Sequence, residues 1–132
     1  MYDFGPQEES NNEIMFRTLM HDAINFVRKE HHLFPCFFHC NFSKVAIQHS
    51  KDMAAKQKVS HDYWTDRQLM FPDWHIGEIL GYNYRSVEGY IDAFLKSKEH
   101  KEILLDATFT YVGIGSALDT NGKQYVTIIF GK

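Results

Sequence analysis

Residues 87–115, VEGYIDAFLKSKEHKEILLDATFTYVGIG, form the stretch that decides the fold. Apolar side chains recur at spacings of three and four between Val87 and Leu95, which predicts a helix with one apolar face. Ser86 precedes this run and can cap the helix by accepting a hydrogen bond from a free backbone N–H. Glu88 falls in the first turn, where the helix dipole favours a negative charge. We therefore expect a helix that begins near residue 87 and packs on a core.

A strand and a hairpin are predicted after this helix. The polar corner SKEHKEIL carries His100, and β-branched and aromatic residues then alternate around two glycines in Thr108–Leu118. Gln124–Phe130 has the same character. The turn Asp119–Gly122 between the two runs contains Asn-Gly, which supplies the positive φ angles of a tight hairpin. The chain is therefore expected to end in an antiparallel β-hairpin.

Two helices are predicted in the first half of the chain. Glu13–Glu30 carries its apolar residues on one helical stripe, and Pro35 forbids a continuation of that helix. A second helix is predicted to begin at Asn41 or Ser43 and to run to about Lys56.

The segment after the second helix is the least regular. Lys58–His75 holds more ring area than a solvated loop needs, so Trp64 and Trp74 are interpreted as core or wall residues. His75–Leu80 is predicted to be a short strand. His49 lies on the inner face of the preceding helix, where a lone histidine is more often a hydrogen-bonded core residue than a ligand.

The order of these elements is α, α, irregular loop, β, α, β, β, without the alternation that builds a parallel sheet. We predict an α+β fold, an α-β-α sandwich with helices packed on a small antiparallel sheet. A length of 132 residues is that of one domain. Residues 1–12 are predicted to be a flexible N-terminal segment, and residues 13–132 a single domain.

The composition excludes some classes of protein. A net charge of -3 gives no reason to expect nucleic acid, because phosphate binding needs a basic surface. No apolar run approaches the ~20 residues that a membrane-spanning helix needs. The first eleven residues lack the basic and apolar regions of a signal peptide, although a mature domain written without its leader would look the same.

The two cysteines, Cys36 and Cys40, stand four residues apart. A local disulfide would require their Cα atoms to lie within ~7 Å. A metal site on them would require His39 or a more distant ligand. The favoured interpretation is two free thiols, with Cys36 buried, because its neighbours Pro35 and Phe38 mark an apolar position.

Residues 14–131 resemble the CAP superfamily of cysteine-rich secretory, antigen-five and pathogenesis-related-one proteins, and the short bacterial members most closely. Phe94 stands where the family has a helical tryptophan, and Ser97 and His100 match the serine and histidine that follow it. Tyr111–Gly115, YVGIG, matches the family's next strand. The resemblance implies the same α-β-α fold.

The resemblance also implies a single cleft. It carries over His61 and Glu78 as the first histidine and glutamate, and His100 as the second histidine. Ser97 occupies the position of the second glutamate of eukaryotic members, so that carboxylate is missing here. Two imidazoles and one carboxylate can hold zinc with water in the fourth place. The same residues could equally form a structural polar cluster in which Glu78 fixes the tautomer of one imidazole.

No nucleophile stands out near these residues. Ser60 precedes His61 and Ser97 lies close to His100, but the G-x-S-x-G sequence of a nucleophile elbow is absent. Ser97 is therefore interpreted as a polar corner residue rather than a catalytic one.

The first functional interpretation is a non-enzymatic CAP-type binding module with a cleft formed by His61, Glu78, His100 and Ser97. The resemblance implies a secreted or cell-surface protein, with zinc or another divalent cation as a candidate cofactor. It also implies a small ligand, a lipid or a host or cell-wall component as partner. The alternative is a zinc-dependent hydrolase that activates water in the same cleft. In a third interpretation the site is vestigial and the surface makes protein–protein contacts.

Overall fold

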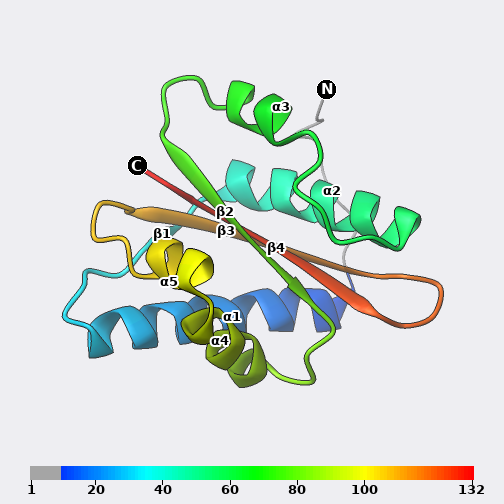
Figure 1. Cartoon of the computed structure of the whole chain (residues 1–132), viewed down its shortest axis with the longest axis horizontal. Helices are drawn as coiled ribbons and strands as arrows, with labels where there is room; N and C mark the ends of the chain where they lie inside the picture. Colours follow the sequence, from blue (N-terminus) through cyan, green and yellow to red (C-terminus); the bar gives the residue numbers. More distant parts are fainter. Residues whose placement is uncertain (1–9) are drawn as a thin grey trace.

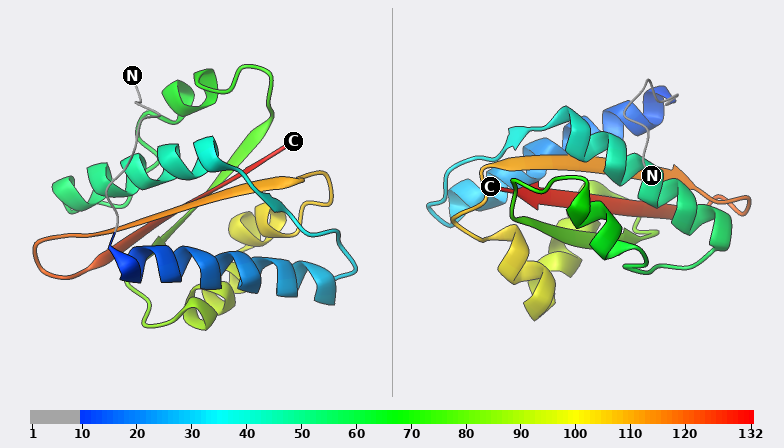
Figure 2. Two further views of the ribbon diagram at one scale, coloured as in Figure 1. Left: turned by 180° about the vertical axis from the view of Figure 1, so that it is seen from behind. Right: turned by 90° about the horizontal axis from the view of Figure 1, so that it is seen from above.

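The computed structural model describes residues 10–132, which form three layers (Figure 1). A sheet seen nearly edge-on separates α2 and α3 on one face from α1, α4 and α5 on the other, as Figures 1 and 2 agree. The elements in chain order are α1 (Asn11–Glu30), β1 (Phe37–Phe38), α2 (Cys40–Lys56), α3 (Trp64–Leu69), β2 (Ile76–Tyr82), α4 (Val87–Lys96), α5 (Lys98–Leu104), β3 (Tyr111–Leu118) and β4 (Gln124–Gly131).

The fold is the predicted α+β sandwich, but its sheet is mixed rather than purely antiparallel. The strand order is β1-β3-β4-β2, and β4 pairs antiparallel with both β2 and β3. The two-residue strand β1 adds to β3 in parallel, with Phe37 opposite Tyr111. Two residues are too few to show an alternating pattern in a sequence, so the prediction lacked this strand. β2 is left at the opposite edge of the sheet.

Each face of the sheet has its own core. One core lies against α1, α4 and α5 and contains Phe94, which is 1% exposed, as its match to the family tryptophan predicted. The other core lies against α2, where Phe42 packs with the partly buried Trp64 and Trp74, as predicted for the two indoles. Gly115 lets α2 approach β3, because a Cβ there would clash with the backbone nitrogen of Ile47.

The helix caps bear out part of the sequence analysis. Ser86 accepts a hydrogen bond from the Gly89 N–H at 3.1 Å, as predicted for the cap of α4. α1 begins at Asn11, two residues before the predicted start, because the Ser10 hydroxyl caps it. Residues 1–9 of the predicted flexible segment lie outside the described residues.

α2 begins at Cys40, earlier than predicted, because an imidazole caps it. Nδ1 of His39 accepts a hydrogen bond from the Phe42 N–H at 3.1 Å, which requires that nitrogen to be unprotonated. Burial lowers the pKa of His39, in keeping with that role. Both cysteines are free thiols and Cys36 is buried, as predicted, whereas Cys40 is exposed.

Three further boundaries differ from the prediction. The irregular segment contains the short helix α3. His100 lies within α5 rather than at a corner between elements, since the chain resumes a helix directly after Ser97. β3 begins at Tyr111 and not at Thr108, because the Asp106 carboxylate accepts hydrogen bonds from the backbone and hydroxyl of Thr108 and forms a turn. In the part of the chain described, no helix has the length and apolar character to cross a membrane.

Candidate functional site

A buried ion pair joins α3 to the edge strand β2. Nε of Arg67 donates to Oε1 of Glu78 at 2.6 Å, and Nη2 donates to Oε2 at 2.7 Å. Both side chains are almost completely buried. His61, in the loop before α3, donates from Nδ1 to the same Oε2 at 2.7 Å. The structure therefore brings together two of the predicted site residues, His61 and Glu78, with an arginine that the prediction did not include.

Arg67 also fixes the protonation of a buried histidine. Its Nη1 donates to Nδ1 of His49 at 3.1 Å and to the backbone oxygen of Asp62 at 2.6 Å. Nε2 of His49 must then carry the proton, which it donates to the Ser60 carbonyl at 2.7 Å. Burial, followed by the Arg67 charge, lowers the pKa of His49. His49 is thus a neutral, hydrogen-bonded core residue, as predicted.

Glu78 remains ionised despite its burial. Burial alone would raise its pKa, but hydrogen bonds from His61 and Arg67 and the positive charge of Arg67 outweigh that cost and lower the pKa. A carboxylate can only accept hydrogen bonds, so Nδ1 of His61 carries a proton. Nε2 of the half-exposed His61 ring is then the atom of this cluster that a ligand could reach.

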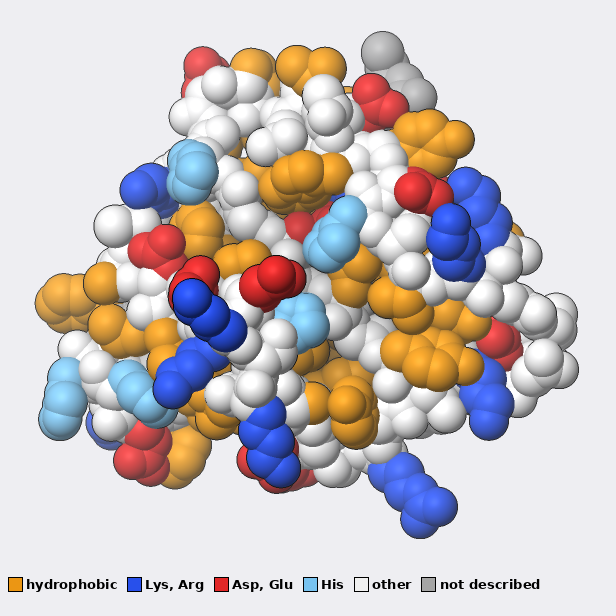
Figure 3. All heavy atoms as spheres, viewed as in Figure 1, with side chains coloured by type: hydrophobic (Ala, Val, Ile, Leu, Met, Phe, Trp, Pro, Cys, Tyr) orange, Lys and Arg blue, Asp and Glu red, His pale blue; other side chains and the backbone are white. Residues whose placement is uncertain are grey.

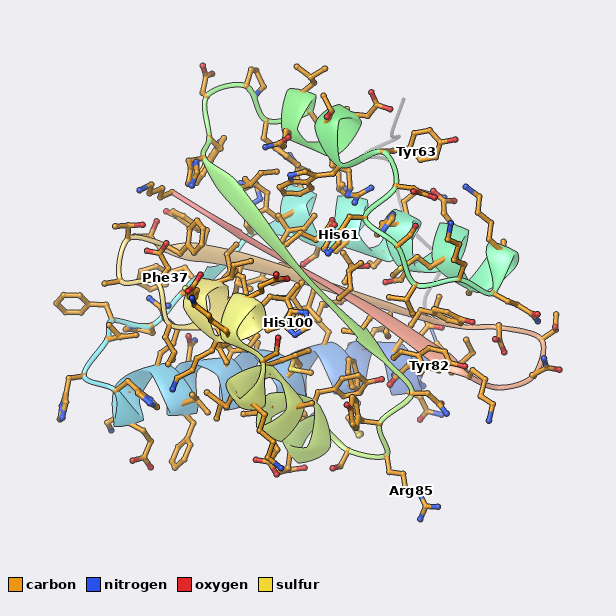
Figure 4. All side chains as sticks on the ribbon, in the orientation of Figure 1. Phe37, His61, Tyr63, Tyr82, Arg85 and His100 are labelled. Carbon is orange, nitrogen blue, oxygen red and sulfur yellow. The ribbon has the colours of Figure 1, made fainter. Side chains whose placement is uncertain are left out.

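His100 lies across β2 from His61, on the same face of the molecule (Figure 4). Its ring packs edge-on against Phe94, with 5.5 Å between ring centroids. Burial lowers the pKa of His100; the nearby His61 acts in the same direction and Glu99 in the opposite one. His100 is therefore a neutral imidazole at pH 7.

An open groove runs over β2 beside His100. Its volume is about 370 Å³, and mostly apolar and aromatic side chains line it. Figure 3 shows imidazoles near the middle of this face, with hydrophobic side chains beside them. Tyr82 lies at the far end of the strand (Figure 4). The residues lining the groove are Val59, Leu80, Gly81, Tyr82, Tyr84, Ala93, Phe94, Ser97 and His100.

The cluster does not fit the three-ligand zinc site that the resemblance implies. Both oxygens of Glu78 are taken by Arg67 and His61, and the guanidinium places a positive charge where a cation would have to bind. Among residues 10–132 no three His, Cys, Asp or Glu side chains are grouped to hold a metal ion. Zinc binding stays a prediction of the resemblance, and the Arg67–Glu78 pair argues against it.

The two candidate serines make contacts other than a serine–histidine pair. The Ser60 hydroxyl accepts from the Asp62 N–H at 3.3 Å, and its carbonyl accepts from His49. Ser97 lines the groove beside His100, and its hydroxyl does not cap α5. A serine nucleophile needs a base within hydrogen-bond reach, and no such pair is found in the described chain.

The sequence analysis did not identify three residues of this region: Arg67, Tyr82 and Tyr84. Arg67 stands six residues after His61 within a segment predicted to be irregular, so no helical face marked it. Tyr82 and Tyr84 lie just past Leu80, where the predicted strand ends. The ring of Tyr82 contacts Tyr125, and the ring of Tyr84 contacts Tyr90.

Comparison with known proteins identifies the family and agrees with the fold. A profile of the cysteine-rich secretory protein family, CAP, matches residues 21–130, which is most of the chain. The chain belongs to the CAP family. An outer surface protein from Borrelia burgdorferi has a similar fold, with a TM-score of 0.82 at 19% identity over 97% of this chain and 98% of that one.

Two other similar proteins are longer than this chain. An extracellular protein from Bacillus anthracis that contains an SCP domain is 24% identical, with a TM-score of 0.77 over 95% of this chain and 44% of that one. The uncharacterized membrane protein YlbC of Bacillus subtilis is 27% identical over 101 residues, 71% of this chain. The chain spans only 29% of the length of YlbC, the curated relative it matches.

Proposed function

We propose that this CAP domain binds an uncharged amphipathic small molecule in the groove over β2. The single observation that carries the proposal is the lining of the groove, in which apolar and aromatic side chains surround one neutral imidazole, His100. Its volume of about 370 Å³ falls within the range of small-molecule sites. Val59 and Tyr82, which line the groove and are 43% and 44% exposed, would contact the apolar part of the ligand, while a ring nitrogen of His100 would hydrogen-bond its polar group.

The charges around the groove favour a neutral ligand over an ion. The residues that line the groove include no Asp, Glu, Lys or Arg, and its one imidazole, His100, is neutral at pH 7. A charged ligand would lose its hydration without gaining an opposite charge, which is unfavourable. A hydroxyl or amide group loses less, because the imidazole can replace a water as its hydrogen-bond partner.

Secretion or display at the cell surface is part of the same proposal. The similar Borrelia burgdorferi protein is an outer surface protein, and the SCP-domain protein of Bacillus anthracis is extracellular. Lipids with an uncharged head group and neutral host or cell-wall molecules belong to the ligand class that the groove would accept. A zinc-dependent hydrolase is not proposed, because the carboxylate it would need is engaged by Arg67.

NMR titration with a shape-matched pair of probes tests the ligand class. 4-Ethylphenol is neutral at pH 7, whereas 4-ethylbenzoate is an anion of similar size. We expect the phenol to shift the backbone amide signals of residues 80–82 and 97–100, and the benzoate to shift them at least tenfold less at equal concentration.

Two variants locate the binding. Ala93→Phe fills the groove and should abolish the shifts, while Ala107→Phe, at an exposed position outside it, should not. Equal shifts by phenol and benzoate would contradict the preference for neutral ligands. Shifts that persist in Ala93→Phe would place the binding elsewhere.

A further inference from the structure

A stripe of exposed apolar side chains runs along the outer side of α1. Met15, Leu19 and Phe26 are 62%, 51% and 64% exposed. At 3.6 residues per turn these positions fall within about 40° of one another around the helix axis. The stripe runs over twelve residues, from Met15 to Phe26, a rise of about 16 Å at 1.5 Å per residue. Side chains of this size are normally buried when they share one helical face, so the stripe marks a contact surface.

Leu19 and Phe26 of this stripe form one wall of a groove between α1 and α4. The groove has a volume of about 550 Å³ and is lined by Leu19, Ala23, Phe26 and Val27 of α1 and by Val87 and Ile91 of α4. Val87 and Ile91 are buried and form the floor of the groove, whereas Leu19 and Phe26 are exposed on its α1 wall. Figures 1 and 2 show α4 lying beside α1 on the same side of the sheet.

All the charged side chains that line the groove are acidic. Asp22 lies within the α1 stripe, and Glu88 and Asp92 stand one turn apart on α4. All three are exposed, so their charges face the solvent at the rim of the groove. An occupant of this groove would therefore need an apolar surface flanked by positive charges.

We infer that the α1–α4 groove binds an amphipathic basic helix of a protein partner. A third helix can lay its apolar ridge between two neighbouring helices, with contacts that recur at spacings of three and four residues. The α1 wall of the groove runs from Leu19 to Val27, about 12 Å, which matches about two turns of such a helix. Lysine or arginine side chains at its flanks would reach Asp22 on one wall and Glu88 and Asp92 on the other.

The same charges disfavour two other occupants. A fatty acid would bring its carboxylate to three carboxylates, and like charges repel. A second copy of this chain, docked through the same groove, would bring three more acidic side chains to the contact. The inference is independent of the function proposed for the β2 groove, because Ala93 and Phe94 of α4 line that groove while Ile91 and Asp92 line this one.

A designed peptide pair provides the test. The probe is a fluorescein-labelled 14-residue peptide of leucine and lysine with leucines at helical spacing; its counterpart has glutamate in place of lysine. Fluorescence anisotropy with the whole chain at 50 mM salt is expected to show saturable binding of the lysine peptide. The glutamate peptide should bind at least 100-fold more weakly.

Matched variants separate this groove from a general charge effect. The triple variant Asp22→Asn/Glu88→Gln/Asp92→Asn should weaken binding of the lysine peptide at least tenfold. The control Asp66→Asn/Asp73→Asn/Glu102→Gln removes the same charge from exposed positions outside the groove and should leave binding within twofold. Leu19→Gln should also weaken binding tenfold, while Leu118→Gln, similarly exposed on the β3–β4 hairpin, should not.

Three results would overturn the inference. The first is equal loss of binding in the two triple variants, which would mean nonspecific attraction. The second is displacement of the lysine peptide by decanoate, which would mean a fatty-acid site. The third is dimerisation of the chain alone by light scattering that Leu19→Gln abolishes, which would mean that a second copy occupies the groove.

Discussion

Replacing Arg67 by methionine should strongly destabilise the fold, because it leaves a carboxylate buried without its main partner. The guanidinium makes two hydrogen bonds to Glu78 and one each to His49 and the Asp62 carbonyl. Methionine fills a similar volume but donates no hydrogen bond. In Arg67→Met, His61 would be the remaining partner of Glu78.

The expected cost is about 3–5 kcal/mol, which is typical when one partner of a buried ion pair is removed. The unpaired acceptors on His49 and Asp62 place the variant in the upper part of that range, since each lost hydrogen bond costs about 1 kcal/mol. With a urea m-value of about 2 kcal/mol per molar, the unfolding midpoint should fall by about 2 M.

Urea denaturation at pH 7.5 and pH 5 measures both the cost and its origin. In the parent, the pKa of Glu78 is lowered, so its stabilising contribution is present above the unfolded value of ~4.3 and is lost as pH falls through the folded pKa. Without Arg67, burial should instead raise that pKa above the unfolded value. The destabilisation should then shrink as pH falls, because the carboxyl can be protonated in the folded state.

Two controls accompany the measurement. Arg85→Met changes an exposed arginine, which points away from the domain in Figure 4, and should stay within about 0.5 kcal/mol of the parent. Arg67→Met/Glu78→Gln removes both charges and should recover part of the loss. A cost below about 1 kcal/mol for Arg67→Met, or the same cost at both pH values, would refute the reasoning.

Three other predictions concern the core and the thiols. Phe94→Ala removes a fully packed ring from the main core and should cost about 3–5 kcal/mol by urea denaturation; a midpoint within error of the parent would mean that the ring is not packed there. Titration with a thiol reagent should detect one fast thiol, the exposed Cys40, and the second, Cys36, only after unfolding, because burial raises the pKa of Cys36; two fast thiols would show that Cys36 is accessible. Gly115→Ala should unfold or severely destabilise the chain, since a Cβ would meet the backbone of α2, whereas Gly89→Ala has room and should stabilise α4 by up to about 1 kcal/mol; similar thermal midpoints for both would contradict the close packing of α2 on β3.

The sequence determined the elements whose signals are local. The apolar spacing from Val87, the Ser86 cap and the Asn-Gly turn each act over a few residues, so α4 and the β3–β4 hairpin could be predicted closely. The resemblance then supplied the layers, and it named His61 and Glu78 as neighbours, which the structure shows in contact. Burial of Cys36 followed from its apolar neighbours.

Only the tertiary structure decided what these residues do together. Arginine is charged and is usually exposed, so the sequence alone predicts an exposed Arg67. The packing of α3 on β2 instead buries its side chain completely against Glu78. That pairing is a long-range contact which no local pattern encodes, and it turns a candidate metal ligand into half of an ion pair. The groove between α1 and α4 arises in the same way, because its two helices are far apart in the chain. The groove over β2 is lined mainly by consecutive elements, and it forms where α4 and α5 pack beside that strand. Local propensity fixes which faces are apolar, but the packing of layers fixes which of those faces remain open to a partner.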